Sequence, residues 1–274
     1  MYIVSAVAEK NAAKVALYNE EYKLVSKNLA EGNDLSSLVL ALLAEAGVKA
    51  EEVAYIGVAV EENVPSLSAY AEKLEKAVGI KSYATALISA RALGEAYLAG
   101  DTATLVLLKI EETVECGVVI DKKVYAGVDQ KGGKLGHHVI NHGGFACTCG
   151  KTGCFEAYAS NAGLQKIAKE AGVAGAETIT HKALFAMDTP EAKAAQKTYV
   201  DFLAAGVTNI INLFQPSELV LEGSFTEAGG GLTEPFTEFI LREQYTRSSP
   251  NKSLLRAPKA DADIALLGAA LLGR

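Results

Sequence analysis

Three of the four cysteines of the chain, Cys147, Cys149 and Cys154, lie close together in a glycine-rich segment. The spacing C-x-C-x4-C brings three thiolates into one turn, and zinc is bound by thiolate and imidazole ligands. Gly150 and Gly153 permit the positive φ angles that a loop wrapped around an ion needs. Structural zinc sites have four ligands, so the pattern predicts a zinc ion with one further ligand nearby.

That fourth ligand has three candidates among the residues just upstream, His137, His138 and His142. The alternative is a set of reduced cysteines that bind no metal. This would leave a poorly packed loop around Gly150 and Gly153. Disulfides are not expected in a reducing compartment, and a redox pair normally has the spacing C-x-x-C. Cys116 stands apart from the cluster and is expected to be an ordinary buried thiol.

The composition limits what else the chain could do. It has 274 residues, a net charge of −7 and a pI near 5.3, which argues against nucleic-acid binding because phosphate contacts need clustered Lys and Arg. There is no apolar run of about 20 residues and no signal-peptide pattern at the start. We therefore expect a cytoplasmic protein without membrane contact.

The apolar patterns of the chain alternate between strands and helices. The predicted strands are Tyr2–Ala8, Lys14–Tyr18, Val53–Val60, Thr104–Ile110, Thr113–Ile120, Val124–Gly127 and Ser217–Leu221. The predicted helices are Leu35–Ala46, Ser66–Val78, Ala86–Leu98, Phe155–Ala171, Lys182–Phe185, Ala192–Phe214, Glu234–Glu243 and Ile264–Leu272. Asn33 or Asp34 is placed to cap the first helix, and a glycine-rich turn is expected from Glu222 to Gly231.

Each half of the chain begins with three strands that are expected to be antiparallel and continues into helices. This repetition predicts a duplicated α/β architecture of two lobes. We expect an N-terminal lobe of residues 1–102, with the C-terminal helix 261–274 packing back on it. Residues 103–260 then form a C-terminal lobe that carries the zinc knot.

The segment around the cysteines resembles the signature of the ROK family of repressors and sugar kinases. Gly136-His137 is followed by C-T-C-G-K-T-G-C-F-E from Cys147 to Glu156, at the family's spacing. The resemblance extends to the segments 92–96, 118–121, 216–223 and 263–270. It implies that His137 is the fourth zinc ligand, that His137 and Glu156 contact a sugar, and that the fold is the two-lobe actin-like ATPase (ribonuclease H-like) fold with nucleotide and sugar between the lobes. Glu156 could equally be a first-turn acid that favours its helix.

Both phosphate-binding motifs of the family are changed in this sequence. Residues 7–11 stand where the family has D-x-G-G-T, without the glycines and without the aspartate that helps to hold magnesium. The second loop contains the three glutamates Glu111, Glu112 and Glu115. A carboxylate 4 Å from a phosphate charge repels it by about 1 kcal/mol in water and about 4 kcal/mol at an effective dielectric of 20. We therefore expect ATP and Mg²⁺ to bind poorly, and we interpret the glutamates as a solvated acidic turn rather than a metal site.

The catalytic motif is changed as well. The family's N-D-A-N aligns with residues 86–89, so Leu87 stands at the position of the catalytic aspartate. No Asp or Glu occurs between Lys76 and Gly94, so a small shift of the alignment cannot supply one. Loss of a positioned general base typically costs about 10²- to 10⁴-fold in rate. Lys134 also replaces a glutamate that contacts the sugar in the family.

Three hypotheses follow from these observations. The first is a non-catalytic pseudokinase that binds a sugar or sugar derivative, or that assembles as a homo-oligomer or with an active relative. The second is an active ATP-dependent hexose or N-acetylhexosamine kinase in which Asp101 or Asp129 serves as the base. The third is a transcriptional regulator, which would need a helix-turn-helix for which the strand beginning at Tyr2 leaves no room. We favour the first.

Overall fold

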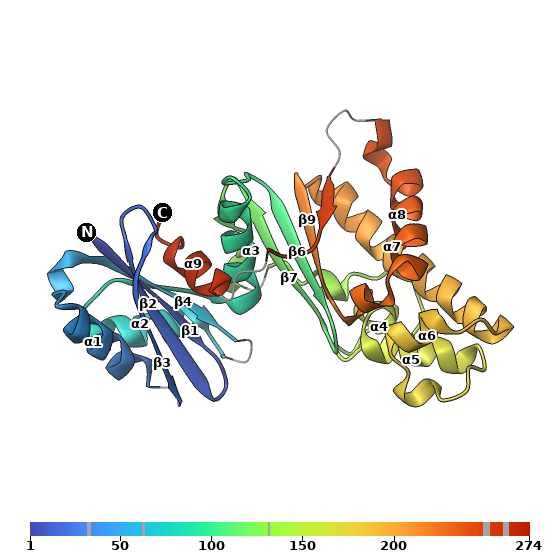
Figure 1. Cartoon of the computed structure of the whole chain (residues 1–274), viewed down its shortest axis with the longest axis horizontal. Coiled ribbons are helices and arrows are strands. Elements are labelled where there is room, and N and C mark those ends of the chain that lie inside the picture. The colour runs from blue at the N-terminus through green and yellow to red at the C-terminus, as the bar shows by residue number, and fades with distance from the viewer. Residues whose placement is uncertain (32–33, 62–63, 131, 249–252, 260–262) are drawn as a thin grey trace. The chain divides into compact units, whose positions relative to one another are not determined.

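The structure is a computed structural model that describes residues 1–31, 34–61, 64–130, 132–248, 253–259 and 263–274. It contains two five-stranded sheets surrounded by helices (Figure 1). The chain folds into two compact units, one of residues 1–105, 117–133 and 259–274, the other of residues 106–116 and 134–258. Each unit is described by itself.

The first sheet has the strand order β3-β2-β1-β4-β5. Its strands are β1 (Tyr2–Ala8), β2 (Ala12–Asn19), β3 (Leu24–Glu31), β4 (Val53–Val60) and β5 (Ser82–Ala86). β1 pairs antiparallel with β2 and parallel with β4, and β4 pairs parallel with β5. The central strands β1 and β4 are almost entirely buried, as their largely apolar sequences predict, and the buried residues of β1 include Ser5.

The second sheet has the order β10-β9-β6-β7-β8. Its strands are β6 (Leu105–Ile110), β7 (Val114–Ile120), β8 (Lys123–Val124), β9 (Glu218–Gly223) and β10 (Leu254–Arg256). When the strands are numbered within each half of the chain, both sheets read third, second, first, fourth, fifth. This shared order confirms the duplicated α/β pattern that the sequence predicts.

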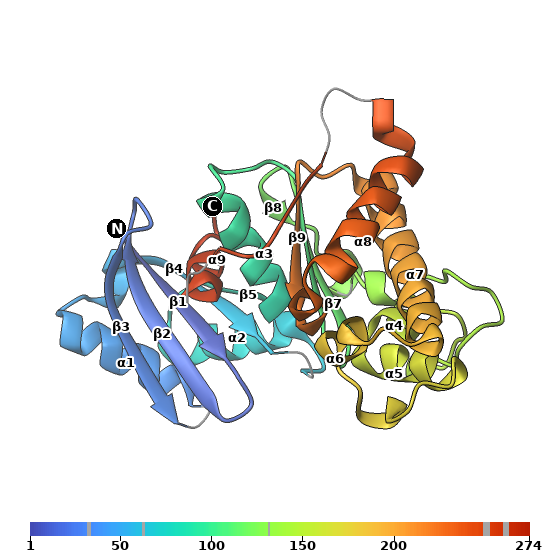
Figure 2. The same cartoon turned by 45° about the vertical axis from the view of Figure 1, so that its right-hand side comes forward.

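Nine α-helices connect the strands of the described chain (Figure 2). They are α1 (Leu35–Ala46), α2 (Leu67–Val78), α3 (Leu87–Leu98), α4 (Glu156–Ala159), α5 (Asn161–Glu170), α6 (His181–Ala186), α7 (Pro190–Phe214), α8 (Gly230–Glu243) and α9 (Ile264–Ala270). Asp34 caps α1 by accepting from the amide of Ser37, and Gly47 ends this helix in the left-handed conformation. None of the helices within the described residues has the length and apolar character needed to cross a membrane.

Helix α9 packs against the first sheet and against α3 at very short backbone distances. A Cβ atom at Gly57 of β4 would lie 1.8 Å from the carbonyl oxygen of Ala269, and one at Gly268 would lie 1.7 Å from that of Ala90. Side chains alternate between faces along a strand. Ile56 and Val58 pack into the core shared with α1, so α9 covers the opposite face of the sheet.

Several predicted elements differ in the structure. The helix expected from Phe155 to Ala171 is two helices, because Ser160 ends α4 and caps α5 by accepting from the amide of Gly163. The strand expected at residues 124–127 is limited to β8 (Lys123–Val124). The glycine-rich turn expected from Glu222 to Gly231 contains a 3₁₀ helix at Ser224–Ala228, and α8 begins at Gly230. The sequence analysis did not predict β5 and β10.

Some predictions fall outside the described residues or are not tested by them. Asn33, the second candidate for the cap of α1, and residues 261–262 of the expected C-terminal helix lie outside the part of the chain that the structure describes. The division into lobes at residues 102/103 and 260/261 stays a prediction.

We expect Gly268→Ala to lower the free energy of unfolding by about 3 kcal/mol, because the added methyl group overlaps the backbone of α3. Gly231→Ala is the matched control, since its Cβ would meet only Phe185 at 3.7 Å and alanine favours a helix. Urea denaturation measures both. Equal stability of the two variants would contradict the packing of α9 on α3.

Candidate functional site

The structure brings the predicted metal ligands together. One ligand atom from each of His137, Cys147, Cys149 and Cys154 lies within 4.8 Å of every other one. Cys147 Sγ lies 3.6 Å from His137 Nδ1, and Cys149 Sγ lies 3.6 Å from Cys154 Sγ. His138 and His142 are not members of this group.

These distances fit a tetrahedral zinc ion. With zinc–sulfur bonds of about 2.3 Å, two sulfur ligands at the tetrahedral angle lie about 3.8 Å apart. A disulfide would require the sulfur atoms to approach to about 2.05 Å, and all four cysteines are free. The donor set of three thiols and one imidazole is the kind that structural zinc sites use, so these side chains could hold the ion.

A short hairpin of backbone hydrogen bonds holds the cysteines in place. The amide of Cys147 donates to the carbonyl of Lys151 at 2.8 Å, and Ala146 bridges to Thr152. Cys154 forms an antiparallel bridge with Val139, which lies two residues after His137. Gly153 has a φ of 77°, and a Cβ there would lie 1.8 Å from the carbonyl oxygen of Asn141. Glycine is therefore required at this position.

The thiols of Cys149 and Cys154 lie in different surroundings. A backbone hydrogen bond from Lys151 lowers the pKa of the exposed Cys149. Burial, followed by the neighbouring thiols, raises the pKa of Cys154 to about 12. Cys154 is buried, and a buried thiolate is stable only when a cation accompanies it, which is consistent with a metal at this position.

Glu156 connects this loop to the second sheet. The side chain is 5% exposed and both of its oxygens are engaged. Oε2 accepts from the amide of Val114 at 3.0 Å, and Oε1 accepts from the hydroxyl of Thr148 at 2.9 Å. Oε1 also lies 3.7 Å from Cys147 Sγ and 3.8 Å from His137 Nδ1. The carboxylate thus lies directly beside the cluster, although the sequence suggested it only as a sugar contact or a first-turn acid.

Tyr158 supports the same loop, and the sequence analysis missed it. Its buried hydroxyl accepts from the amide of Phe145 at 2.9 Å and from the side-chain amide of Asn141 at 2.8 Å. Its ring stacks on Phe145 with centroids 4.4 Å apart. A Cβ at Gly144 would lie 1.9 Å from this hydroxyl, which explains the glycine there. The signal for Tyr158 in the sequence is its position four residues after the last cysteine, Cys154.

The turn between β1 and β2 is the place where the first phosphate motif was expected. It is tight, with the amide of Glu9 donating to the carbonyl of Ala12 at 2.9 Å. The amide of Lys10 donates to Glu61 Oε2 at 2.8 Å. A backbone N–H of this turn is therefore already hydrogen-bonded to the carboxylate of Glu61.

The turn between β6 and β7 is the place where the second phosphate motif was expected. Asn161, the first residue of α5, is hydrogen-bonded to this turn. Asn161 donates its amide to the carbonyl of Glu111 at 2.9 Å and its side-chain nitrogen to Glu112 Oε1 at 2.9 Å. Asn161 Oδ1 accepts from Ser224 at 2.9 Å. Glu112 is exposed, Glu111 and Glu115 are half-buried, and Cys116 lies away from the metal ligands in β7.

His181 lies beside this chain of hydrogen bonds without extending it, because Ser224 donates its only hydroxyl hydrogen to Asn161 Oδ1. Nδ1 lies 3.3 Å from Ser224 Oγ, and Nε2 lies 2.7 Å from the hydroxyl of Tyr199, which donates to the carbonyl of Ala159. The hydroxyl of Tyr199 therefore accepts from Nε2–H, and this assigns the tautomer of the neutral ring. Burial lowers the pKa of His181 to about 4.

The residue at the expected catalytic position and one alternative base lie at opposite ends of α3. Leu87 is the first residue of this helix, and the first turn, which the structure describes in full, carries no acidic side chain. Asp101 follows the end of the 12-residue helix, so about 18 Å separates the two ends. Two hydrogen bonds from Arg274, followed by one from Lys122, lower the pKa of Asp101 to about 2. The side chain of Asp129 lies outside the described part of the chain.

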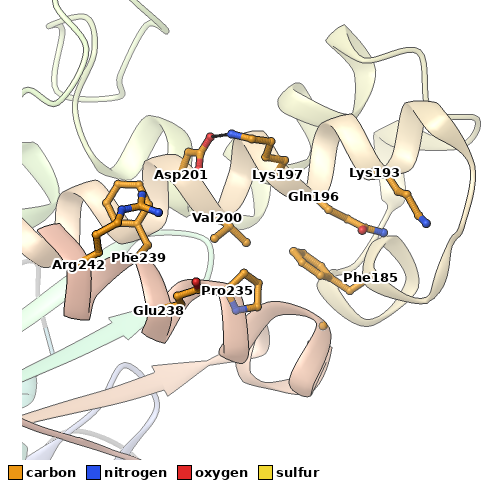
Figure 3. Close-up of a pocket in the computed structure, with 11 residues that line it drawn as sticks. Phe185, Lys193, Gln196, Lys197, Val200, Asp201, Pro235, Glu238, Phe239 and Arg242 are labelled. Carbon is orange, nitrogen blue, oxygen red and sulfur yellow. Dashed lines mark hydrogen bonds and ion pairs between the residues drawn. The ribbon is translucent and has the colours of Figure 1, made fainter.

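A separate groove of about 380 Å³ lies between α7 and α8 (Figure 3). Phe185, Val200, Pro235 and Phe239 provide its apolar walls. The cations at its rim are engaged, since Lys197 pairs with Asp201 at 2.5 Å (Figure 3). None of the predicted site residues is among the described residues that line this groove.

We expect protein purified without chelator to contain about one zinc ion per chain, and Cys149→Ala to lose it. Because Cys149 is exposed, the substitution removes little packing, so a fall of the melting temperature by roughly 5–10 °C would report the lost metal. Cys116→Ala is the matched control and should retain the zinc. Elemental analysis that finds far less than one equivalent, or an unchanged melting temperature in Cys149→Ala, would refute the assignment.

His181 should make the protein less stable in acid. The imidazole titrates near 6.5 in the unfolded chain and near 4 in the folded protein, so the unfolded chain binds the proton first as the pH falls. The contribution of the neutral ring is present above pH 6.5 and is lost between pH 6.5 and 4, by on the order of 3 kcal/mol. His181→Gln should flatten this part of the pH–stability curve, whereas His142→Gln, at an exposed position, should not. Identical curves for His181→Gln and the unsubstituted protein would contradict the account.

Comparison with known proteins agrees with the fold. A glucokinase from Halalkalibacterium halodurans is 33% identical over 164 residues, which is 54% of this chain and 50% of the relative, so this chain matches only half the length of that enzyme. An N-acetylmannosamine kinase from Salmonella typhi is 28% identical over 204 residues, which is 74% of this chain and 68% of the relative.

The crystal structure of a ROK hexokinase from Thermus thermophilus superimposes with a TM-score of 0.81 at 24% identity, covering 99% of this chain and 98% of the hexokinase. This likeness shows a shared α/β fold that contains two sheets. The sequence profile of the ROK family matches residues 16–274, nearly the whole chain. The chain therefore belongs to the ROK family.

Proposed function

We propose that this protein is a catalytically inactive member of the sugar-kinase branch of the ROK family, a pseudokinase that binds a sugar or sugar derivative or assembles with other subunits. The observation that carries the proposal is the start of α3, where Leu87 stands in place of a general base and no acidic side chain occupies the first turn. A sugar hydroxyl placed there would have no group to take its proton.

The first two carboxylates that follow Leu87 in the sequence do not replace the missing base. Glu95, farther along α3, is 1% exposed, and its Oε1 accepts from the amide of Lys259 at 2.8 Å. Asp101 is bound by two cations and has its pKa lowered to about 2, far below the value suited to accepting a proton near neutral pH. Its place beyond the other end of α3 also separates it from residue 87.

The two phosphate turns support the same proposal. The amide of Lys10 in the first turn already bonds to the carboxylate of Glu61. The amide of Val114, at the end of the second turn, already bonds to the carboxylate of Glu156. A phosphate group approaching either turn would meet a carboxylate that already holds a backbone amide, and at the second turn it would also meet Glu112. The family profile begins at residue 16, after the first of these turns.

The ligand class is taken from the relatives. The two kinases compared above are named for glucose and for N-acetylmannosamine, so we propose a hexose or N-acetylhexosamine as the ligand. His137 and Glu156 would contact it, since a carboxylate has about four acceptor sites and Glu156 uses two of them within the chain. The zinc ion would have a structural role.

The remaining expectations complete the proposal. Residues 1–102 with the C-terminal helix form one lobe and residues 103–260 the other, in an actin-like ATPase arrangement. The protein acts in the cytoplasm, as a homo-oligomer or beside an active relative, without binding nucleic acid.

The alternative is an active ATP-dependent hexose or N-acetylhexosamine kinase with substituted catalytic groups. The names of the two relatives favour it, because both are kinases. It requires a base that is not at residue 87, and Asp101 would have to lose its two ion pairs to serve.

We expect Mg-ATP to give no binding heat in titration calorimetry and hexoses to give no ADP release above the buffer blank. Should ADP be released, Asp101→Asn distinguishes the sources, because removal of a true base would slow release by about 10²- to 10⁴-fold. Asp188→Asn, at an exposed ion pair with Lys193, is the matched control. Hexose-dependent turnover that falls in Asp101→Asn and persists in Asp188→Asn would overturn the pseudokinase proposal.

A further inference from the structure

The segment that follows the last cysteine holds the β6–β7 turn at both of its ends. Cys154 is a predicted zinc ligand, and Glu156 accepts from the amide of Val114, where β7 begins. Asn161 binds the carbonyl of Glu111 and the side chain of Glu112 on the other side of the turn. One short stretch of chain therefore joins the metal cluster to the turn.

The segment 136–154, which carries the predicted ligands and is called the metal loop here, also packs against the carbonyl of Val114. Gly136 precedes the ligand His137, and a Cβ atom at Gly136 would lie 2.6 Å from the carbonyl oxygen of Val114. Thr148, between the ligands Cys147 and Cys149, donates to the second oxygen of Glu156. The amide of Val114 is thus hydrogen-bonded to Glu156, and its carbonyl packs closely against the residue before His137.

We infer that zinc binding sets the conformation of the β6–β7 turn through Glu156, which acts as a positioning residue. Bound zinc fixes His137, Cys147 and Cys154 relative to one another. This holds Thr148 and Glu156 at the distances that keep the amide of Val114 bonded. Without zinc, these ligands are no longer held relative to one another, and the bond to Val114 loses this support. The inference rests on the zinc site proposed above and is independent of whether the protein is catalytic.

The consequence reaches a second turn. Asn161 Oδ1 accepts from Ser224, the first residue of the 3₁₀ helix that follows β9. The hydrogen bonds of Asn161 therefore connect the β6–β7 turn with the turn after β9. Zinc supply would then regulate the surface formed by these two turns, and with it any ligand or subunit that binds there.

Amide hydrogen exchange of zinc-loaded and zinc-depleted protein tests the inference. We expect zinc depletion to speed exchange of the Val114 amide by about ten- to hundredfold, as for loss of a hydrogen bond to a charged acceptor. The amides at the centre of α7, around Leu203, serve as the internal reference and should remain protected. An unchanged rate at Val114 after zinc removal, or a protein that does not take up added zinc, would overturn the inference.

Zinc depletion could unfold the whole unit of residues 106–116 and 134–258. In that event, variants that keep the zinc test the role of Glu156. Thr148→Val removes one hydroxyl at an exposed position and should speed exchange of Val114 about tenfold while zinc content stays at one equivalent. Thr152→Val, exposed in the same loop, is the matched control and should leave the rate unchanged. Equal rates in these two variants would overturn the role of Glu156.

Glu156 itself supplies a test by rescue. Glu156→Gln can still accept from Val114 through its oxygen and donate to Thr148 Oγ1 through its nitrogen, so slow exchange should persist. Glu156→Ala should speed exchange without release of zinc, and equally slow exchange in the two variants would contradict the inference. ADP release is measured separately, so an active kinase with a zinc-sensitive turn would refute the pseudokinase proposal alone.

Discussion

The carboxylate of Glu156 is buried between two parts of the chain and accepts a hydrogen bond from each of them. One oxygen bonds to the backbone of the second sheet, and the other to a hydroxyl beside the cysteines. A buried carboxylate without such partners would be costly, so the arrangement constrains both the metal loop and the β6–β7 turn. The glycines at 136, 144 and 153 allow close packing in the same region, because backbone or side-chain atoms occupy the space of their Cβ atoms.

The resemblance to the family places phosphate at two turns, the one between β1 and β2 and the one between β6 and β7. A backbone amide of each turn is already hydrogen-bonded to a carboxylate of the chain. In each, a glutamate from elsewhere in the chain accepts a backbone amide hydrogen bond, Glu61 in one turn and Glu156 in the other. A carboxylate satisfies such a donor as a phosphate oxygen would, and it repels a second anion. Together with Leu87 at the start of α3, these contacts support the proposal that the protein is a pseudokinase.

The sequence predicted what depends on local pattern. The helices Leu35–Ala46 and Leu67–Val78 and the buried strand Val53–Val60 were found nearly to the residue, because caps and apolar periodicity are local signals. The predicted metal ligands could be identified because they are close in sequence, and the structure brings their ligand atoms together. The contacts that define their surroundings could not be identified, since Glu156 bonds to a residue 42 positions away and Arg274 to one 173 positions away. The break at Ser160 was missed because the apolar spacing runs through it, and β5 and β10 because they are short.

The most direct test of the account is a crystal structure of zinc-loaded protein grown with a non-hydrolysable Mg-ATP analogue, with diffraction measured at the zinc absorption edge. The account predicts an anomalous peak among His137, Cys147, Cys149 and Cys154. It also predicts that Glu156 remains bonded to the amide of Val114 and that no phosphate lies on the β6–β7 turn. An ordered triphosphate on that turn, with Glu156 displaced from Val114, would contradict it.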